Sequence, residues 1–403
     1  MRRDAHRPSP AISADLLRIA LVVWPDGAGG HRLTTAATPG TLEDGVESYL
    51  VLPHLRSPRF LLPLDATPQA RSRLLLRYNR LRSDRRRATR SALAGLVRFG
   101  LPRPRPGVNL VRAAGSPSSL LADVAAALGA APGSLVLSTG VRPGTGTPRP
   151  TLNVADREGR PRAFVKVALD PGQQATLAWE HDLAADFARE PVPGLLVPRP
   201  LFRLTSGNAL VVGVEALPID IRRVRVGDRE RVQPWLDRLV ASRPRAALRL
   251  DDSPWTARLA DDAAALPEPW RGPTTAAVAR LRRDHGTRVV EHGLRHGDWS
   301  PWNMGRVGAD RLAVWDWEFS EPLAPLGLDE WNWGFAHDTS VRGRTMPEAA
   351  AGLRAAAAGR PTTALTAELL LVDMAVRRAA EAAAGAAASA AYARDLLDLL
   401  SCR

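Results

Sequence analysis

The spacing of apolar residues predicts a chain whose first half is rich in strands and whose second half is rich in helices. Short apolar runs bounded by turn residues predict strands at residues 16–23, 48–52, 59–62, 135–139, 151–155, 163–167, 198–202 and 208–214. Apolar positions three or four apart predict helices at residues 117–128, 174–189, 229–241, 254–266 and 274–285. The alanine-rich residues 347–400 predict more helix, interrupted at 359–361.

A long basic helix is predicted near the N-terminus. Thr67 and Pro68 form a typical helix start, and apolar positions continue to about Phe99. Its polar positions are crowded with arginine: Arg77, Arg80, Arg82, Arg85, Arg86, Arg87 and Arg90. A solvated helix face is the simpler interpretation, and contact with nucleic acid or anionic lipid is the alternative. The proline-rich residues 101–107 cannot continue a helix and predict a linker.

The composition is that of an ordinary globular protein of two or three domains. The chain has 403 residues, 45% hydrophobic and 24% charged, and a formal net charge of +13. The positive charge allows a nucleic-acid partner, but the arginines are dispersed and few aromatic residues lie among them. A single cysteine, Cys402, excludes a disulfide framework and a cysteine-based zinc site. With no membrane-length apolar run and no signal-peptide pattern, we expect a cytoplasmic protein.

One lysine stands out against this arginine-rich background. Of the 55 basic residues, Lys166 alone is lysine. An ammonium is a compact point charge, whereas a guanidinium is a wide planar fork, so the two are not interchangeable at a tight site. Lys166 lies in the predicted strand 163–167, from which an inward ammonium could reach phosphate oxygens.

The most informative stretch reads HGDWSPWN, from His296 to Asn303. It follows the apolar run 287–291 and precedes the run 311–315, which ends at Asp316. One carboxylate and one carboxamide therefore lie in a tight loop, and a second carboxylate lies at the exit of the next strand. This layout suits phosphoryl transfer: Asp298 would accept the proton of an attacking hydroxyl, while Asn303 and Asp316 would hold Mg²⁺ against nucleotide phosphates.

The H-x-D-x-x-x-x-N spacing, followed by the Asp316-Trp317-Glu318 strand end, resembles the aminoglycoside phosphotransferase and choline kinase branch of the protein-kinase-like fold. The resemblance covers most of the chain from Ser116 onward. It implies an α+β fold with a small mixed β lobe and a larger helical lobe. The N-terminal α/β region is extra to this fold.

Further site residues follow from the resemblance. It implies that Lys166 pairs with Glu180 on the following helix, and that 212–218, including Glu215 and Leu217, binds adenine through backbone groups. The resemblance also implies that His296 anchors the loop and that Asp329 braces it. The simpler role for Asp329 is that of a helix N-cap. The hairpin loop 140–150 would cover the phosphates, although it lacks the G-x-G-x-x-G pattern.

These interpretations predict three parts: an accessory region at 1–112, a nucleotide-binding lobe at 113–218, and a catalytic helical lobe at 219–403. The predicted activity is phosphorylation of a small-molecule hydroxyl by ATP or another NTP with Mg²⁺. An aminoglycoside, a sugar or an amino alcohol would serve as the acceptor. The alternative is a kinase-like scaffold without turnover, or a basic module that binds nucleic acid. A zinc site on His292 and His296 is a weaker rival, because Gly293 between them disfavours the helix it needs.

Overall fold

The computed structural model describes residues 12–25, 33–35, 47–77, 81–113, 119–141, 150–359 and 361–401. Several sequence predictions concern residues outside these ranges: residues 78–80 of the predicted basic helix, Ser116 and Pro117, most of the 140–150 loop, Arg360 and Cys402. The described residues fall into two compact units. The first comprises 1–188 and 198–221, and the second comprises 189–197 and 222–403. The predicted α+β class is confirmed.

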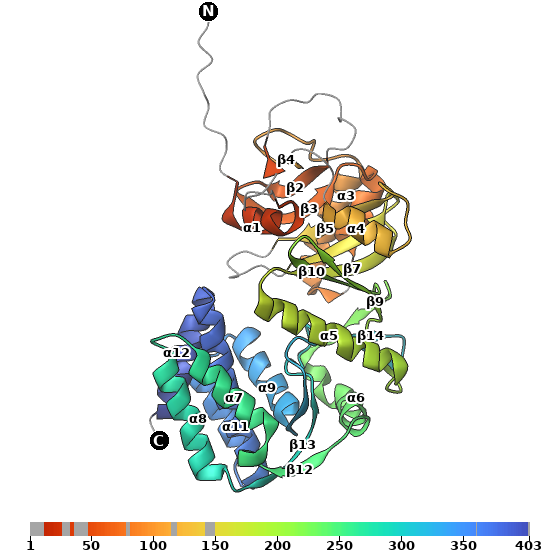
Figure 1. Cartoon of the computed structure of the whole chain (residues 1–403). Coiled ribbons are helices and arrows are strands. Elements are labelled where there is room, and N and C mark those ends of the chain that lie inside the picture. The colour runs from red at the N-terminus through yellow and green to blue at the C-terminus, as the bar shows by residue number, and fades with distance from the viewer. Residues whose placement is uncertain are drawn as a thin grey trace, which may run out of the picture. The chain divides into compact units, whose positions relative to one another are not determined.

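One sheet forms the centre of the first unit (Figure 1). Its described strands, in spatial order, are β1 (Leu33–Thr34), β4 (Leu110–Ala113), β2 (Ser48–His54), β3 (Ser57–Pro63), β5 (Leu135–Gly140), β6 (Thr151–Asp156), β7 (Pro161–Ala168), β10 (Ala209–Val214) and β9 (Pro200–Ser206). Every neighbouring pair is antiparallel. Strands from both sides of residue 112 therefore share one sheet, joined where β3 pairs with β5. The division into 1–112 and 113–218 stays a prediction.

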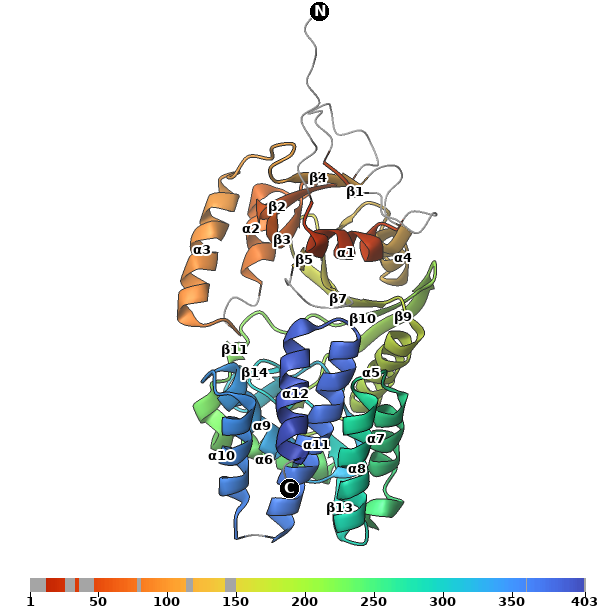
Figure 2. The same cartoon turned by 90° about the vertical axis from the view of Figure 1, so that its left-hand side faces the viewer.

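Both faces of this sheet are covered by helices (Figure 2). Side chains alternate between faces along a strand. Val51 and Leu61 accordingly pack with α1 (Ala14–Val23) and α4 (Ser119–Ala127), whereas Leu50 and Leu62 pack with α2 (Pro68–Leu76) and α3 (Asp84–Arg98). The sheet is therefore an interior layer over much of its area.

The prediction of a strand at 16–23 is wrong, because this segment is the helix α1. Leu16, Ile19, Ala20 and Val23 are buried, and their spacing is that of one helix face. The Ser13 hydroxyl caps the helix by accepting a hydrogen bond from the Leu16 N–H at 3.3 Å. An apolar run of eight residues fits a strand or a buried helix equally well, and only the burial pattern distinguishes them.

The predicted helix 67–99 starts where expected but is not continuous. Thr67 caps α2, accepting from the Ala70 N–H at 3.1 Å, and α2 ends at Leu76. A second helix, α3, begins at Asp84. Residues 85–87 on α3 are exposed, as a solvated face requires, but Arg77 is only 8% exposed. Arg77 therefore does not belong to the solvated basic face that the sequence predicts.

The second unit combines two small sheets with a helical bundle. One sheet has the order β11 (Arg222–Arg223), β14 (Met304–Val307), β15 (Arg311–Val314) and β8 (Leu195–Leu196); the other has the order β12 (Ala246–Arg249), β13 (Val289–Arg295) and β16 (Glu321–Pro325). Its α-helices are α6 (Arg229–Ala241), α7 (Pro254–Ala265), α8 (Arg271–His285), α9 (Leu328–Ser340), α10 (Met346–Ala357), α11 (Pro361–Ala383) and α12 (Ala387–Ser401). The three helices predicted between 229 and 285 are confirmed by α6, α7 and α8.

The helix α11 runs through the core of this unit. Figure 2 shows it among the other helices of this unit, and it contacts α7, α8, α9, α10 and α12. Leu369, Leu370 and Leu371 along it are completely buried. The break predicted near 359–361 separates α10 from α11. A second break, at Gly385 with φ +93°, was not predicted. Among the described residues, no helix has both the length and the apolar character that a membrane crossing requires.

The cap of α2 gives a stability prediction. Thr67→Ala removes the acceptor for the Ala70 N–H and should lower the free energy of unfolding by about 1 kcal/mol. Thr275→Ala on α8 is the matched control: the Thr275 hydroxyl only donates to backbone carbonyls within its own helix, Arg271 O at 2.6 Å and Gly272 O at 3.0 Å. Urea denaturation of the full chain measures both. Equal effects of the two changes would contradict the capping role.

Candidate active site

The HGDWSPWN segment forms a buried loop between two strands. Residues 296–303, here called the 296–303 loop, connect the end of β13 to the start of β14. Gly297 has φ +81°, a conformation in which side chains are rare. A Cβ atom on Gly297 would lie 1.9 Å from the Phe319 carbonyl oxygen. The loop thus requires glycine at this position for two independent reasons.

Asp329 holds the backbone at the start of this loop. Its two carboxylate oxygens accept hydrogen bonds from the His296 N–H at 2.6 Å and the Gly297 N–H at 2.9 Å. Asp329 lies in the first turn of α9 and is 5% exposed. The N-cap of that helix is Gly327, so Asp329 does not have the simpler capping role. These contacts are those expected of a brace for the loop.

Both ring nitrogens of His296 contact backbone groups. Nδ1 accepts a hydrogen bond from the Asp298 N–H at 3.2 Å, and Nε2 lies 3.2 Å from the Trp315 carbonyl oxygen. The tautomer with its proton on Nε2 satisfies both contacts. The ring also packs against Trp317, with centroids 4.5 Å apart. His296 is completely buried, and its contacts suit the anchoring role that the sequence predicts.

The Asp298 carboxylate is half-buried and contacts three donors. Oδ2 accepts from Asn303 Nδ2 at 2.7 Å and from Trp302 Nε1 at 3.4 Å, while Oδ1 accepts from Asn332 Nδ2 at 3.4 Å. Asn332 lies on α9, one turn from the Asp329 brace. The same helix therefore holds the loop backbone and contacts the predicted catalytic carboxylate.

The register of a hairpin places Asn303 beside Trp315, the residue before Asp316. Met304 pairs with Val314 across β14 and β15, and the Trp315 N–H donates to the Asn303 carbonyl at 3.0 Å. Asp316 is the next residue, with φ +68°, a strained conformation that aspartate tolerates better than most residues. Asn303 Nδ2 donates to Asp298 Oδ2 at 2.7 Å, a contact that does not use the amide oxygen of Asn303. A carboxylate and an amide oxygen are the hard ligands that Mg²⁺ prefers.

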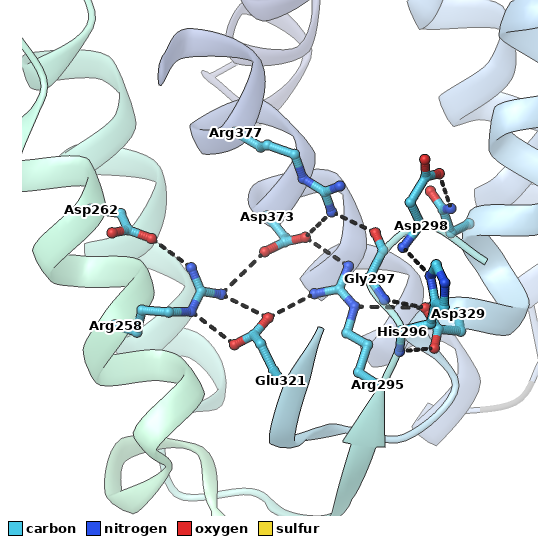
Figure 3. A network of polar contacts seen from close by, with 11 residues as sticks. Arg258, Asp262, Arg295, His296, Gly297, Asp298, Glu321, Asp329, Asp373 and Arg377 are labelled. Carbon is cyan, nitrogen blue, oxygen red and sulfur yellow. Dashed lines mark hydrogen bonds and ion pairs between the residues drawn. The ribbon is translucent and has the colours of Figure 1, made fainter. Parts of the chain in front are cut away.

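A network of ion pairs lies next to the loop. Its members, here called the Arg295 network, are Arg258, Arg295, Glu321, Asp373 and Arg377 (Figure 3). Arg295 Nη2 contacts Asp373 Oδ2 at 2.8 Å, and Nη1 contacts Glu321 Oε1 at 3.3 Å. Arg258 Nε contacts Glu321 Oε2 at 2.8 Å. Arginine and carboxylate charges alternate through the network, as burial of charge requires.

Burial and pairing have opposite effects on the pKa values of this network. Burial alone would raise the pKa of Asp373, but the charges of Arg295, Arg377 and Arg258 outweigh it and hold the pKa well below its usual range. Burial alone would lower the pKa of Arg295, and the carboxylates of Asp373, Glu321 and Asp329 reverse that effect. Both groups are therefore charged at neutral pH.

The first unit carries the predicted lysine–glutamate pair. Lys166 Nζ lies 2.7 and 2.8 Å from the two carboxylate oxygens of Glu180. Lys166 comes from β7, where it pairs with Val212 of β10, and Glu180 comes from α5 (Pro171–Arg189). Both side chains retain some exposure, 25% for Lys166 and 15% for Glu180. The structure brings these two residues together as predicted; their role in nucleotide binding stays a prediction.

The segment predicted to bind adenine has an unexpected neighbour. Glu215 is exposed, and its carboxylate pairs with Arg199 at 2.9 Å. The Leu217 carbonyl accepts a hydrogen bond from Arg77 Nη2 at 3.4 Å. The Arg77 guanidinium also lies 5.5 Å from the ring centroid of Phe164, which is two residues before Lys166 on the same face of β7. The accessory region thus reaches this segment.

Sequence reasoning missed Asn332, Arg77 and most of the Arg295 network. Asn332 follows Asp329 by three residues, a helical spacing that could have indicated a shared face. Arg295 directly precedes the loop in the sequence, but nothing in the sequence indicates its partners. Asp373 and Arg377 lie in an alanine-rich helix about 80 residues away, and no local pattern links them to the loop.

The zinc alternative finds no support in the part of the chain that the structure describes. His292 lies within β13 and His296 directly follows that strand, so no helix joins the two residues, and the Nδ1 atom of His292 lies 2.8 Å from the Val290 carbonyl oxygen. No group of three or more His, Cys, Asp or Glu side chains among the described residues is placed to hold a metal ion. A magnesium site with fewer such side chains would take further ligands, such as Asn303, phosphate and water.

Comparison with known proteins finds distant structural similarity. No family model and no curated protein matches the chain. Among solved structures it is similar to an aminoglycoside phosphotransferase, a thermostable mutant of APH(4)-Ia in a ternary complex with ADP and hygromycin B. The sequence identity is 14% and the TM-score is 0.47, and the match covers 70% of this chain and 98% of the other.

Two other similar structures are kinases by name. One is a putative fructosamine-3-kinase from Haemophilus somnus, with 12% identity, a TM-score of 0.43, and coverage of 69% and 95%. The other is a microcompartment-associated aminopropanol kinase, with 16% identity, a TM-score of 0.43, and coverage of 70% and 96%. At this distance the similarity carries no argument about the activity of this chain, which depends on the contacts described above.

The crowding at Gly297 gives a second prediction. Gly297→Ala combines backbone strain with a collision against the Phe319 carbonyl and should lower the free energy of unfolding by several kcal/mol, roughly 3 or more. The matched control is Gly308→Ala, because Gly308 has φ +67° but only the Asp310 side chain within 4 Å. It should cost only the strain, about 1 kcal/mol. Thermal or urea denaturation that gives equal losses would contradict the tight contact at Gly297.

Proposed function

We propose that this chain is a phosphotransferase that moves the terminal phosphoryl group of ATP to a hydroxyl of a small molecule. One observation carries the proposal: the Asp298 carboxylate is half-buried and oriented by Asn303 and Asn332 in a loop whose backbone Asp329 fixes. Phosphoryl transfer depends mainly on positioning and on charge stabilisation, and this site supplies a positioned proton acceptor.

In the proposed reaction Asp298 orients the acceptor hydroxyl and takes its proton. The hydroxyl oxygen forms a bond to the terminal phosphorus, the bond from that phosphorus to the bridging oxygen breaks, and ADP leaves. His296 is an unsuitable base, because both of its ring nitrogens already contact backbone groups. Asp298 is the residue whose carboxylate combines partial exposure with fixed orientation.

Asn303 and Asp316 are the residues that would hold Mg²⁺. They fit the ion by their chemistry, one amide oxygen and one carboxylate, and the hairpin register places Asn303 beside Trp315, the residue before Asp316. Mg²⁺ bound there would neutralise the charge of the nucleotide phosphates. Two protein ligands suffice, because Mg²⁺ usually keeps several waters and takes substrate phosphate oxygens as further ligands.

Lys166 is the proposed phosphate contact in the first unit. Glu180 holds its ammonium from two carboxylate oxygens, which keeps the charge in place on β7. Backbone groups of 212–218 remain the proposed adenine contacts, with Arg77 at the Leu217 carbonyl.

A small acceptor is proposed rather than a protein. Only 12 residues separate Asp316 from Asp329, and five of them form β16, which pairs with β13. This leaves no room for a long segment that could bind a polypeptide. A sugar, an amino alcohol or an aminoglycoside remains open as the acceptor.

The proposal predicts that Asp298→Asn abolishes turnover. Removing the proton acceptor while keeping the shape should lower the rate of ATP-dependent phosphorylation by about 10²–10⁴-fold in a panel of hydroxyl metabolites. Asp252→Asn is the control, since Asp252 is an exposed carboxylate near Arg249, at 3.9 Å. Product formation is measured by mass spectrometry. A phosphorylation rate that Asp298→Asn leaves unchanged would contradict the catalytic role of Asp298.

The single lysine permits a direct test of nucleotide binding. An ATP analogue with an acyl group on its terminal phosphate should acylate Lys166 and no other side chain, because the sequence has no second lysine. Excess ATP should suppress the labelling, and Lys166→Arg should remove it. Peptide mass spectrometry identifies the labelled residue. Labelling that ATP does not reduce would contradict the proposed phosphate contact.

A further inference from the structure

Arg377 connects the core helix α11 to the backbone of the 296–303 loop. Its Nη2 atom donates to the Gly297 carbonyl at 2.9 Å and also lies 3.2 Å from Asp373 Oδ2 (Figure 3). Asp373 Oδ2 also accepts from Arg295 Nη2 at 2.8 Å. The side chain of Asp373 is 5% exposed and that of Arg377 is 16% exposed. A buried carboxylate therefore holds the guanidinium that contacts the loop.

The peptide group that Arg377 contacts is the one directly before Asp298. The Gly297 carbonyl and the Asp298 N–H belong to one planar unit. Arg377 holds the oxygen of that unit, and His296 Nδ1 accepts from its N–H at 3.2 Å. The orientation of this plane sets the direction in which the Asp298 side chain leaves the backbone.

Arg377 also contacts the segment that follows Asp316. Its guanidinium lies 4.3 Å from the ring centroid of Phe319, three residues after Asp316. The Phe319 carbonyl in turn lies against Gly297, where an added Cβ atom would be 1.9 Å away. Arg377 thus touches both segments that carry proposed reacting groups, one beside Asp298 and one shortly after Asp316.

We propose that Arg377, held by Asp373, is a positioning residue that aligns Asp298 with the reacting groups. This inference depends on the proposed function, because that function gives Asp298 its catalytic role. The contact between Arg377 and the loop is observed whether or not that function is correct. Arg377 acts through the Gly297–Asp298 peptide rather than on substrate. The α11 helix therefore contributes to catalysis as well as to the hydrophobic core.

A purely structural role for Arg377 predicts a different effect of its loss. If Arg377 only stabilised the fold, its loss would lower the unfolding free energy and leave the folded fraction fully active. If it positions Asp298, the folded protein itself turns over more slowly at unchanged nucleotide affinity. The two roles are separated by measuring kcat and the KM for ATP on folded protein.

The experiment compares Arg377→Ala, Arg377→Lys and Arg378→Ala in the full chain, with Mg·ATP and water as acceptor. Arg378 is the matched control, because it is the next residue on α11 and pairs with Glu381 at 2.7 Å rather than with the loop. We expect Arg377→Ala to lower kcat for ATP hydrolysis by about 10–100-fold with KM for ATP changed less than about twofold. Lysine should restore part of the rate, because its ammonium can donate to the Gly297 carbonyl, and Arg378→Ala should match the wild type.

Two results would overturn the positioning role. One is an unchanged kcat in Arg377→Ala. The other is a loss of rate that lysine does not restore and that follows the loss of folded protein. If Arg377→Ala does not fold, folded Arg377→Lys is compared with Arg378→Ala: a lower kcat in Arg377→Lys supports the positioning role, and equal kcat values contradict it.

Hydrogen exchange keeps this inference separate from the proposed function. Arg377→Ala should speed amide exchange in peptides that cover 296–299 and leave those that cover α6 unchanged. Failure of the wild type to phosphorylate any acceptor of the hydroxyl-metabolite panel, together with faster exchange at 296–299, would reject the proposed function and keep the contact between α11 and the loop. Unchanged exchange at 296–299 would reject the contact itself.

Discussion

The buried guanidinium of Arg295 is the charge on which the polar contacts of the second unit depend. Removing a charge from water costs several kcal/mol unless partners replace the lost hydration. Asp373 and Glu321 contact Arg295 directly, and Asp329 lies 4.0 Å from its Nε atom. Asp329 also binds two N–H groups of the 296–303 loop. The loop conformation and the burial of Arg295 therefore depend on the same carboxylates.

This dependence explains how a short loop can present a carboxylate in a fixed direction. Gly297 adopts a conformation that other residues avoid, and Asp329, His296 and Arg377 hold the peptide groups on either side of it. If Asp298 is the proton acceptor, as proposed, a carboxylate held this way needs little reorganisation before reaction. The rigidity comes from α9 and α11, which are core helices, rather than from the loop sequence itself.

The N-terminal region is part of the same sheet as the predicted nucleotide-binding strands. β3 pairs with β5, so the accessory strands extend the sheet that also contains β7 and Lys166. Arg77 at the end of α2 lies over Phe164 and contacts the Leu217 carbonyl. The arginine density of residues 77–90 suggested one solvated face, but tertiary packing separates buried Arg77 from exposed Arg85, Arg86 and Arg87.

The sequence by itself determined the features that depend on local spacing. The strands at 48–52 and 163–167, the start of α2 at Thr67, and the joint pattern of Lys166, Glu180, Asp298, Asn303 and Asp316 could all be recognised in the chain. The helix at 16–23 could not be recognised, because a short apolar run fits the periodicity of a helix or of a strand. Only the packing of neighbouring elements shows which face is buried. Only the tertiary structure decided that Asp373 and Arg377 contact the 296–303 loop. A buried charge needs partners that are close in space but can be distant in sequence. Asp373 and Arg377 are about 80 residues away from the loop along the chain.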